Sequence, residues 1–131
     1  MRIQPRGLQL KALAEADDGS PVVMLNLLKF KAHAQGEEGT GAGAYARYAA
    51  ELERILAEVG GSVLFLGRAS QVVIGDDAEQ DWDVVLLVRY PSRAAFLEMI
   101  ARPDYQDAQA HREAGLANTV LIACSPIDAI V

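Results

Sequence analysis

The sequence is poor in the features that mark disulfide-bonded, membrane-spanning and nucleic-acid-binding proteins. Its single cysteine, Cys124, has no partner within the chain, so we expect no internal disulfide and a reducing, cytoplasmic setting. No apolar run approaches the roughly 20 residues that cross a bilayer, and we expect no secretory signal at the N-terminus. Lysine and arginine number 12 against 18 acidic residues and form no basic cluster, which argues against nucleic acid and membranes as partners.

Signals for metals and cofactors are also sparse. The chain has two histidines, His33 and His111, and contains neither a His-x-x-x-His nor a Cys-x-x-Cys spacing. We therefore predict no metal site and no cofactor, and we expect Cys124 to be an inert thiol in a strand. A haem or metal enzyme stays open as an alternative, which colour or bound metal in the purified protein would reveal.

Glycine is concentrated in one polar stretch, residues 31–43, which contains Gly36, Gly39, Gly41 and Gly43. Their spacing is not the Gly-x-Gly-x-x-Gly of dinucleotide sites, and no Gly-Lys-Ser/Thr follows. The stretch is also long for a strand–helix connection that cradles a phosphate. We therefore predict a flexible flap here and not a nucleotide site.

The chain of 131 residues, 51% hydrophobic and 23% charged, is enough for one globular domain. We treat residues 1–131 as a single domain, with residues 1–20 as an N-terminal helical extension and residues 21–126 as the core. Ser92 and Asp104 are expected helix caps, and Gly60-Gly61 an expected helix end. Periodicity predicts helices over residues 7–16, 44–59, 93–101 and 105–114, and strands over residues 22–30, 63–74, 82–90 and 119–125.

After the leading helix, the order of elements is β-α-β-β-α-β. This order is typical of the ferredoxin-like split βαβ fold, an α+β arrangement with an antiparallel sheet and its helices on one face. Residues 22–30 and 82–90 then form the two central strands. Both alternating sets of side chains on residues 22–30 are apolar, so the face without helices needs a second cover. We predict a homodimer that pairs through this open sheet face.

Several blocks of the sequence stand out together. They are residues 21–30, the helix with Tyr45 and Tyr48 that ends at Gly60-Gly61, residues 72–75, residues 82–93 with Phe96, and Pro103-Asp104-Tyr105 followed by Arg112. These blocks resemble the domain-of-unknown-function 1330 family. The resemblance implies a dimeric α+β barrel, in which two ferredoxin-like subunits enclose a barrel between their sheets. It brings no reaction, because this family has none firmly assigned. The wider superfamily contains quinone-forming monooxygenases, lactone isomerases and haem enzymes, as well as members with no known catalysis, and a shared fold does not transfer activity.

Two polar residues stand out on the central strands. Asn26 lies in the middle of a buried strand, where an amide without partners costs about 1–3 kcal/mol. It either points into a ligand cavity or is a satisfied core amide. Arg89 either offers a fork to a carboxylate or enolate, or extends from the strand end into water. Symmetric pairing of the central strands places Lys29 opposite Asp83, so we predict an ion pair there over a catalytic lysine.

The helices add further candidates. Tyr45 and Tyr48 lie three residues apart and can both lean towards the sheet, although most such tyrosines are core residues. His111 is the best general acid/base candidate by its ordinary pKa, with Arg112 beside it, but we favour a solvent-facing histidine over a catalytic one. Trp82 is expected to pack at the sheet edge.

Two hypotheses for function follow. The favoured one is a cytoplasmic homodimer with a pocket between sheet and helices, lined by Asn26, Tyr48, Arg89 and His111 and covered by the glycine-rich flap. The ligand would be a small, partly apolar or anionic metabolite, and any chemistry would be cofactor-free proton transfer or oxygen addition. The alternative is a non-catalytic dimeric module in which the polar groups simply pair.

Overall fold

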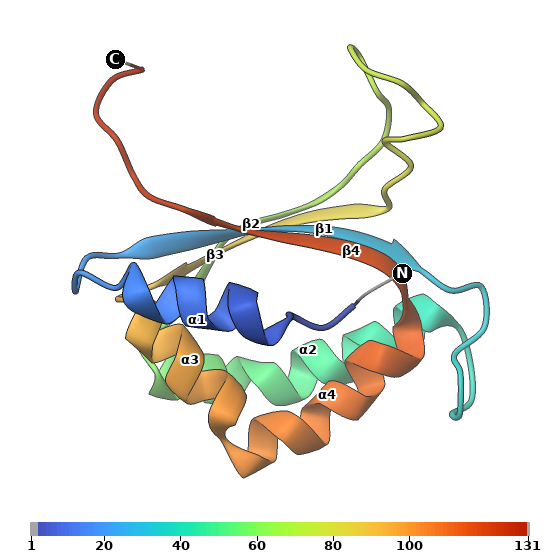
Figure 1. Ribbon diagram of the computed structural model, residues 1–131. Coiled ribbons are helices and arrows are strands. Elements are labelled where there is room, and N and C mark those ends of the chain that lie inside the picture. The colour runs from blue at the N-terminus through green and yellow to red at the C-terminus, as the bar shows by residue number, and fades with distance from the viewer. Residues whose placement is uncertain (1–2, 131) are drawn as a thin grey trace.

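A computed structural model describes residues 3–130 and arranges them as a four-stranded sheet with helices on one face (Figure 1). The sheet is antiparallel, in the order β2-β3-β1-β4, so β1 and β3 are central as the element order predicts. The elements are α1 (Gly7–Glu15), β1 (Val22–Phe30), α2 (Gly41–Glu58), β2 (Ser62–Arg68), β3 (Val84–Tyr90), α3 (Arg93–Ala101), α4 (Pro103–Gly115) and β4 (Leu116–Cys124).

Strand β1 contributes alternate residues to the two sides of the sheet. Val22, Met24 and Leu28 are buried under the helices, and Val22 and Met24 pack in one core with the inner residues of α2 and α3. Asn26 has the same parity and therefore also faces the helices. It lies opposite Leu86 on β3, as the symmetric register predicts.

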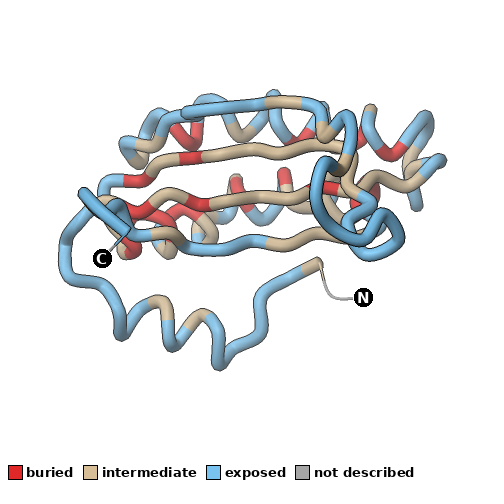
Figure 2. Tube along the Cα trace, turned by 90° about the horizontal axis from the view of Figure 1, so that it is seen from above, coloured by how far each residue is buried: buried red, intermediate tan, exposed pale blue. Residues whose placement is uncertain are grey.

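The opposite face of the sheet has no cover among residues 3–130. Figure 2 looks onto this face and shows strands that are mostly part-buried or exposed. Val23, Leu25 and Leu27 on β1 point this way, and Ile122 on β4, opposite Leu25, is 47% exposed. Two arms, residues 69–83 and 125–130, rise from the sheet on this side (Figure 1). They carry exposed aliphatic side chains, which are Val73, Ile74, Ile127 and Ile130.

Several boundaries differ from the sequence prediction. Strand β2 ends at Arg68 and not at residue 74, and β3 begins at Val84 and not at residue 82, because the chain between them leaves the sheet as an arm. Helix α2 begins three residues early, at Gly41, where the Thr40 hydroxyl accepts a hydrogen bond from the Gly43 amide. Strand β4 likewise begins early, at Leu116.

Not every residue that was predicted to start or end a helix does so. Ser92 caps α3 and Gly60, with φ of 79°, follows the end of α2, as expected. The prediction that Asp104 caps α4 is wrong: Pro103 is already the first helical residue, so Asp104 falls inside the first turn. The register of β2 against β3 shifts between Val63 and Phe65.

The end of β1, the start of α2 and the end of α4 meet at two glycines. A Cβ on Gly41 would lie 2.2 Å from the Lys31 carbonyl oxygen, and one on Gly115 would lie 2.3 Å from the Gly41 carbonyl oxygen. Backbone hydrogen bonds from Lys31 to Gly115 (2.8 Å) and from Gly41 to Lys31 (3.0 Å) use this close approach. The contact fixes both long helices against the same strand end.

Candidate functional site

A cavity of about 230 Å³ lies between the sheet and the helices. Its walls are mostly apolar and come from β1, β3, α2, α3, α4 and the N-terminal segment. The polar groups in these walls are few, and most belong to tyrosines. They include Asn26, Tyr45, Tyr48, Tyr90, Tyr105 and Arg112.

Asn26 presents one half of its amide to this cavity. Its Nδ2 donates to the carbonyl oxygens of Met24 and Leu86, each at 3.2 Å. Because both partners are acceptors, the nitrogen must occupy that side and Oδ1 must point away from it. No protein donor among residues 3–130 reaches Oδ1, yet none of their buried side-chain polar atoms lacks a partner, so Oδ1 is accessible. The cavity therefore receives a hydrogen-bond acceptor from the middle of the sheet.

Three tyrosines form a connected cluster on the helical side. The hydroxyls of Tyr48 and Tyr105 are 3.1 Å apart, and the rings of Tyr45 and Tyr48 have centroids 5.2 Å apart. Burial raises the pKa of the Tyr45 hydroxyl to about 12 and that of Tyr48 well above its usual value. Burial also raises the pKa of Tyr90. These phenols are therefore neutral at physiological pH and can donate hydrogen bonds.

Arg112 is the one cationic side chain that lines this cavity within the described chain. Its Nη1 donates to the carbonyl oxygen of Ile3, which joins the N-terminal segment to α4. Arg112 also lines a neighbouring groove of about 670 Å³ between α1 and β4. Helix α1 buries none of its residues, and in Figure 2 it lies beyond the sheet edge. The N-terminal segment, residues 3–15, thus borders the cavity from outside the core, and only its Leu13 packs against the core.

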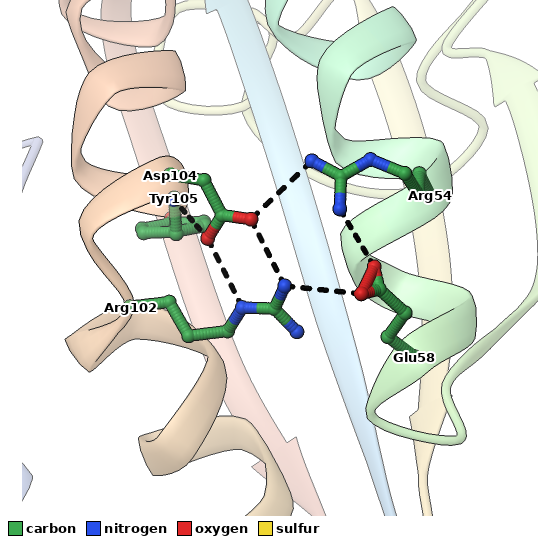
Figure 3. Close-up of polar contacts among 5 residues, drawn as sticks. All are labelled: Arg54, Glu58, Arg102, Asp104 and Tyr105. Atoms are coloured by element: carbon green, nitrogen blue, oxygen red, sulfur yellow. Dashed lines mark hydrogen bonds and ion pairs between the residues drawn. The ribbon is translucent and has the colours of Figure 1, made fainter.

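The ion-pair cluster in Figure 3 holds the start of α4 against α2. The guanidinium of Arg102 spans both oxygens of Asp104, at 3.0 and 2.9 Å, and reaches Glu58 at 3.3 Å. Arg54 pairs with Glu58 at 2.7 Å and with Asp104 at 3.3 Å. Hydrogen bonds from Arg102, and then from Arg54, hold the pKa of Asp104 below its usual value. The backbone amide of the next residue, Tyr105, donates to the Asp104 carboxylate at 2.9 Å, and the Tyr105 side chain lines the cavity.

The structure brings together only some of the residues that the sequence assigned to one pocket. Asn26 and Tyr48 line the cavity, and so do Tyr45 and Arg112. Arg89 lies opposite Val23 and therefore points to the open face, on the other side of the sheet from Asn26.

His111 also lies outside the cavity, although it neighbours Arg112. Its Nδ1 is 3.0 Å from the Glu37 carboxylate, and its Nε2 is 3.6 Å from that of Glu51. Arg47 contacts the same Glu37 at 2.6 Å. The glycine-rich stretch is thus tied to α2 and α4, and none of its residues lines the cavity. The described structure gives the covering position to the N-terminal segment and not to the predicted flap.

The remaining candidates are structural in their contacts. The predicted Lys29–Asp83 ion pair forms at 3.3 Å, and Asp81 joins it at 3.0 Å from the same Nζ. The Trp82 indole donates to the Gln80 side chain at 3.2 Å within the first arm. Sequence reasoning missed Tyr105 and Gln109 as cavity residues. A signal existed, because residues 105, 109 and 112 recur at helical spacing on one face of α4.

These features define a ferredoxin-like α+β protein with a tyrosine-lined cavity beneath its sheet. The chain belongs to the family described as Domain of unknown function (DUF1330), whose profile matches residues 38–124. A comparison with curated proteins finds no match. No helix within residues 3–130 is long and apolar enough to cross a membrane.

Solved structures include a strong match to a protein of unknown function from Rhodopseudomonas palustris, with 35% identity, a TM-score of 0.90 and 98% of each chain covered. A dimeric protein of unknown function with a ferredoxin-like fold, from Bacteroides fragilis, matches at 11% identity and a TM-score of 0.52, covering 79% of this chain and 94% of that one. SnoaB, a cofactor-independent oxygenase from Streptomyces nogalater, matches at 13% identity and a TM-score of 0.56, covering 85% of this chain and 97% of that one. The last two likenesses concern the fold alone.

Proposed function

We propose that the protein is a cytoplasmic homodimer whose subunits each bind a small, partly apolar metabolite in the cavity between sheet and helices. The observation that carries this proposal is the accessible Oδ1 of Asn26, an acceptor in a mostly apolar cavity that neutral phenols also line. A few placed polar groups in an apolar cavity are the usual make-up of a small-molecule site. The free thiol of Cys124 fits a reducing compartment.

Chemistry at this site would be cofactor-free. The hydroxyl pair of Tyr48 and Tyr105 can donate a hydrogen bond to an oxygen of the ligand, and Asn26 Oδ1 can accept one. Such hydrogen bonds can stabilise the enolate of an activated carbon acid, from which cofactor-free proton transfer or oxygen addition would start. The acidic proton would pass to water, because neutral phenols and an amide are not bases at neutral pH. The same fold serves a cofactor-independent oxygenase in SnoaB, which makes the proposal compatible with the architecture.

Dimerisation would proceed through the open face. Apolar side chains on β1 and β4 lie uncovered there, and both arms extend past them with exposed isoleucines (Figure 1). A contiguous apolar face of this kind is typical of an interface. The structure from Bacteroides fragilis, which is described as dimeric, shares the fold.

One observation favours a second function, a non-catalytic dimeric module. The Asn26 amino group is fully used by two backbone carbonyls, and a cavity of about 230 Å³ is smaller than the roughly 300 Å³ at which ligand pockets usually begin. In this case the amide would serve only to link β1 with β3.

A fragment screen read by thermal shift distinguishes the two functions. We expect some fragments to stabilise the parent protein and to lose that effect in Asn26→Ala and in Tyr48→Phe. Glu53→Gln, an exposed position on the outer side of α2, serves as the control and keeps the parent profile. Identical profiles in Asn26→Ala and the parent would favour the non-catalytic module.

A further inference from the structure

The charge of Arg112 is not balanced by the protein around it. Arg47, Arg54 and Arg102 each contact a carboxylate, whereas no ion pair to Arg112 forms among residues 3–130. The adjacent Glu113 carboxylate accepts instead from the Gln4 amide. The guanidinium of Arg112 uses one donor on the Ile3 carbonyl and keeps its other donors for a further acceptor.

The cavity and the adjoining groove, both lined by Arg112, differ in charge from the rest of the protein. Neither the cavity nor the adjoining groove is lined by any aspartate or glutamate of the described chain. The groove adds Arg6 and Arg93. The whole protein has a net charge of −6, whereas the charged residues of the described chain that line these two hollows are all arginines. A concave, partly apolar site with uncompensated cations concentrates small anions.

The phenols next to Arg112 are suited to the same kind of ligand. Tyr45 and Tyr48 lie close enough for the positive charge of Arg112 to oppose the rise of their pKa values, yet burial keeps both hydroxyls neutral. The Tyr45 hydroxyl has no protein partner among residues 3–130 and is accessible. A ligand oxygen near Arg112 can therefore accept from a guanidinium and from a phenol together.

We propose that Arg112 is the carboxylate-binding residue of the cavity, and that its ligand is a small monocarboxylate with an apolar body. This inference rests on the proposed function and names the ligand class of that site. The planar guanidinium fork matches a carboxylate in two parallel hydrogen bonds. The apolar body then lies among Leu52, Phe96 and Met99, with Asn26 Oδ1 available to a donor at its far end. One cation in the cavity balances one negative charge, which favours a carboxylate over a phosphate.

The test compares ligands that differ only in charge. Benzoate and benzamide, hexanoate and hexanamide, and phenyl phosphate are titrated into the full chain, with binding read from ¹H–¹⁵N NMR shifts of Asn26 and the Tyr48 amide. We expect each carboxylate to bind at least about tenfold more tightly than its amide. In Arg112→Gln this preference disappears, and in Arg112→Lys it is reduced because charge remains without the fork. Arg68→Gln, an exposed arginine on β2, keeps the parent preference.

The outcomes separate the two proposals, given circular dichroism that shows each variant folded. Equal binding of acid and amide, or a preference that survives Arg112→Gln, overturns the carboxylate assignment and leaves the proposed pocket in place. Tighter binding of phenyl phosphate than of benzoate also overturns it. If no probe, charged or neutral, perturbs the cavity signals, both the assignment and the proposed pocket fail.

Discussion

At the scale of single residues, Gly41 and Gly115 are tightly constrained. They lie where the start of α2 and the end of α4 meet the end of β1. A Cβ at Gly41 would lie 2.2 Å from one backbone oxygen and 2.7 Å from another, and neither can move without shifting a strand or a helix. We expect Gly41→Ala to lower the free energy of unfolding by about 3 kcal/mol, as overpacking of a rigid contact does. Urea unfolding measures this. Gly7→Ala, with nothing within 4 Å, is the control and stays near the parent value.

The hydroxyl pair in the cavity makes a second prediction for single residues. Tyr48 and Tyr105 are both buried, and their oxygens are 3.1 Å apart. We expect Tyr48→Phe and Tyr105→Phe each to destabilise the protein, and the double variant to cost less than the sum, with a coupling of about 0.5–1.5 kcal/mol. Thermal or urea unfolding of the parent, the two single variants and the double variant gives the double-mutant cycle. Strict additivity would mean that the two hydroxyls do not bond.

The elements are held in place partly by charge, and the cluster between α2 and α4 predicts a pH dependence. Arg102 and Arg54 lower the pKa of Asp104 in the folded protein below 3.8, the ordinary value. A carboxylate with a depressed folded pKa contributes stability that is present above the unfolded pKa and is lost as the pH falls through the folded one. We expect Asp104→Asn to be less stable than the parent at neutral pH and to lose less on acidification below 3.8.

Acid titration of the free energy of unfolding checks this prediction. Asp107→Asn is the matched control, because Asp107 lies exposed on the same helix and forms no ion pair within residues 3–130. Parallel acid limbs for the parent and Asp104→Asn would show that the cluster in Figure 3 contributes nothing to folding.

Periodicity located most elements because it is strongest where one face is buried. Strand β1 was predicted with its observed bounds, and α2 to within three residues at its start and one at its end. The apolar residues 72–74 were predicted as strand because they resemble a buried run, yet they belong to an arm that leaves the sheet. Local sequence does not distinguish an apolar segment that pairs within a sheet from one that projects from it.

The sequence predicts the residues of the site only where the strand register is used to decide which face of the sheet each side chain occupies. Asn26 stood out as one amide in an apolar strand, and it lines the cavity. The register that places Asn26 opposite Leu86 also places Arg89 opposite Val23, and strand alternation puts Val23 and Asn26 on opposite faces. The grouping of Arg89 with Asn26 could therefore have been rejected from the sequence. The role of the N-terminal segment could not, because its position depends on long-range contacts such as that between Ile3 and Arg112.

At the scale of the whole molecule, the open face makes the last prediction. Ile122 lies opposite Leu25 near the middle of this face and is 47% exposed, so a charge there is tolerated by an isolated subunit. In a dimer that packs two such faces together, the same charge is buried without a partner and opposes association. We expect the parent protein to sediment as a dimer and Ile122→Asp as a folded monomer. Leu8→Asp is the control, because Leu8 is also apolar and 81% exposed but lies on α1. A parent that sediments as a monomer would refute the proposed dimer, whereas an Ile122→Asp variant that stays dimeric would show that the subunits pair through another surface.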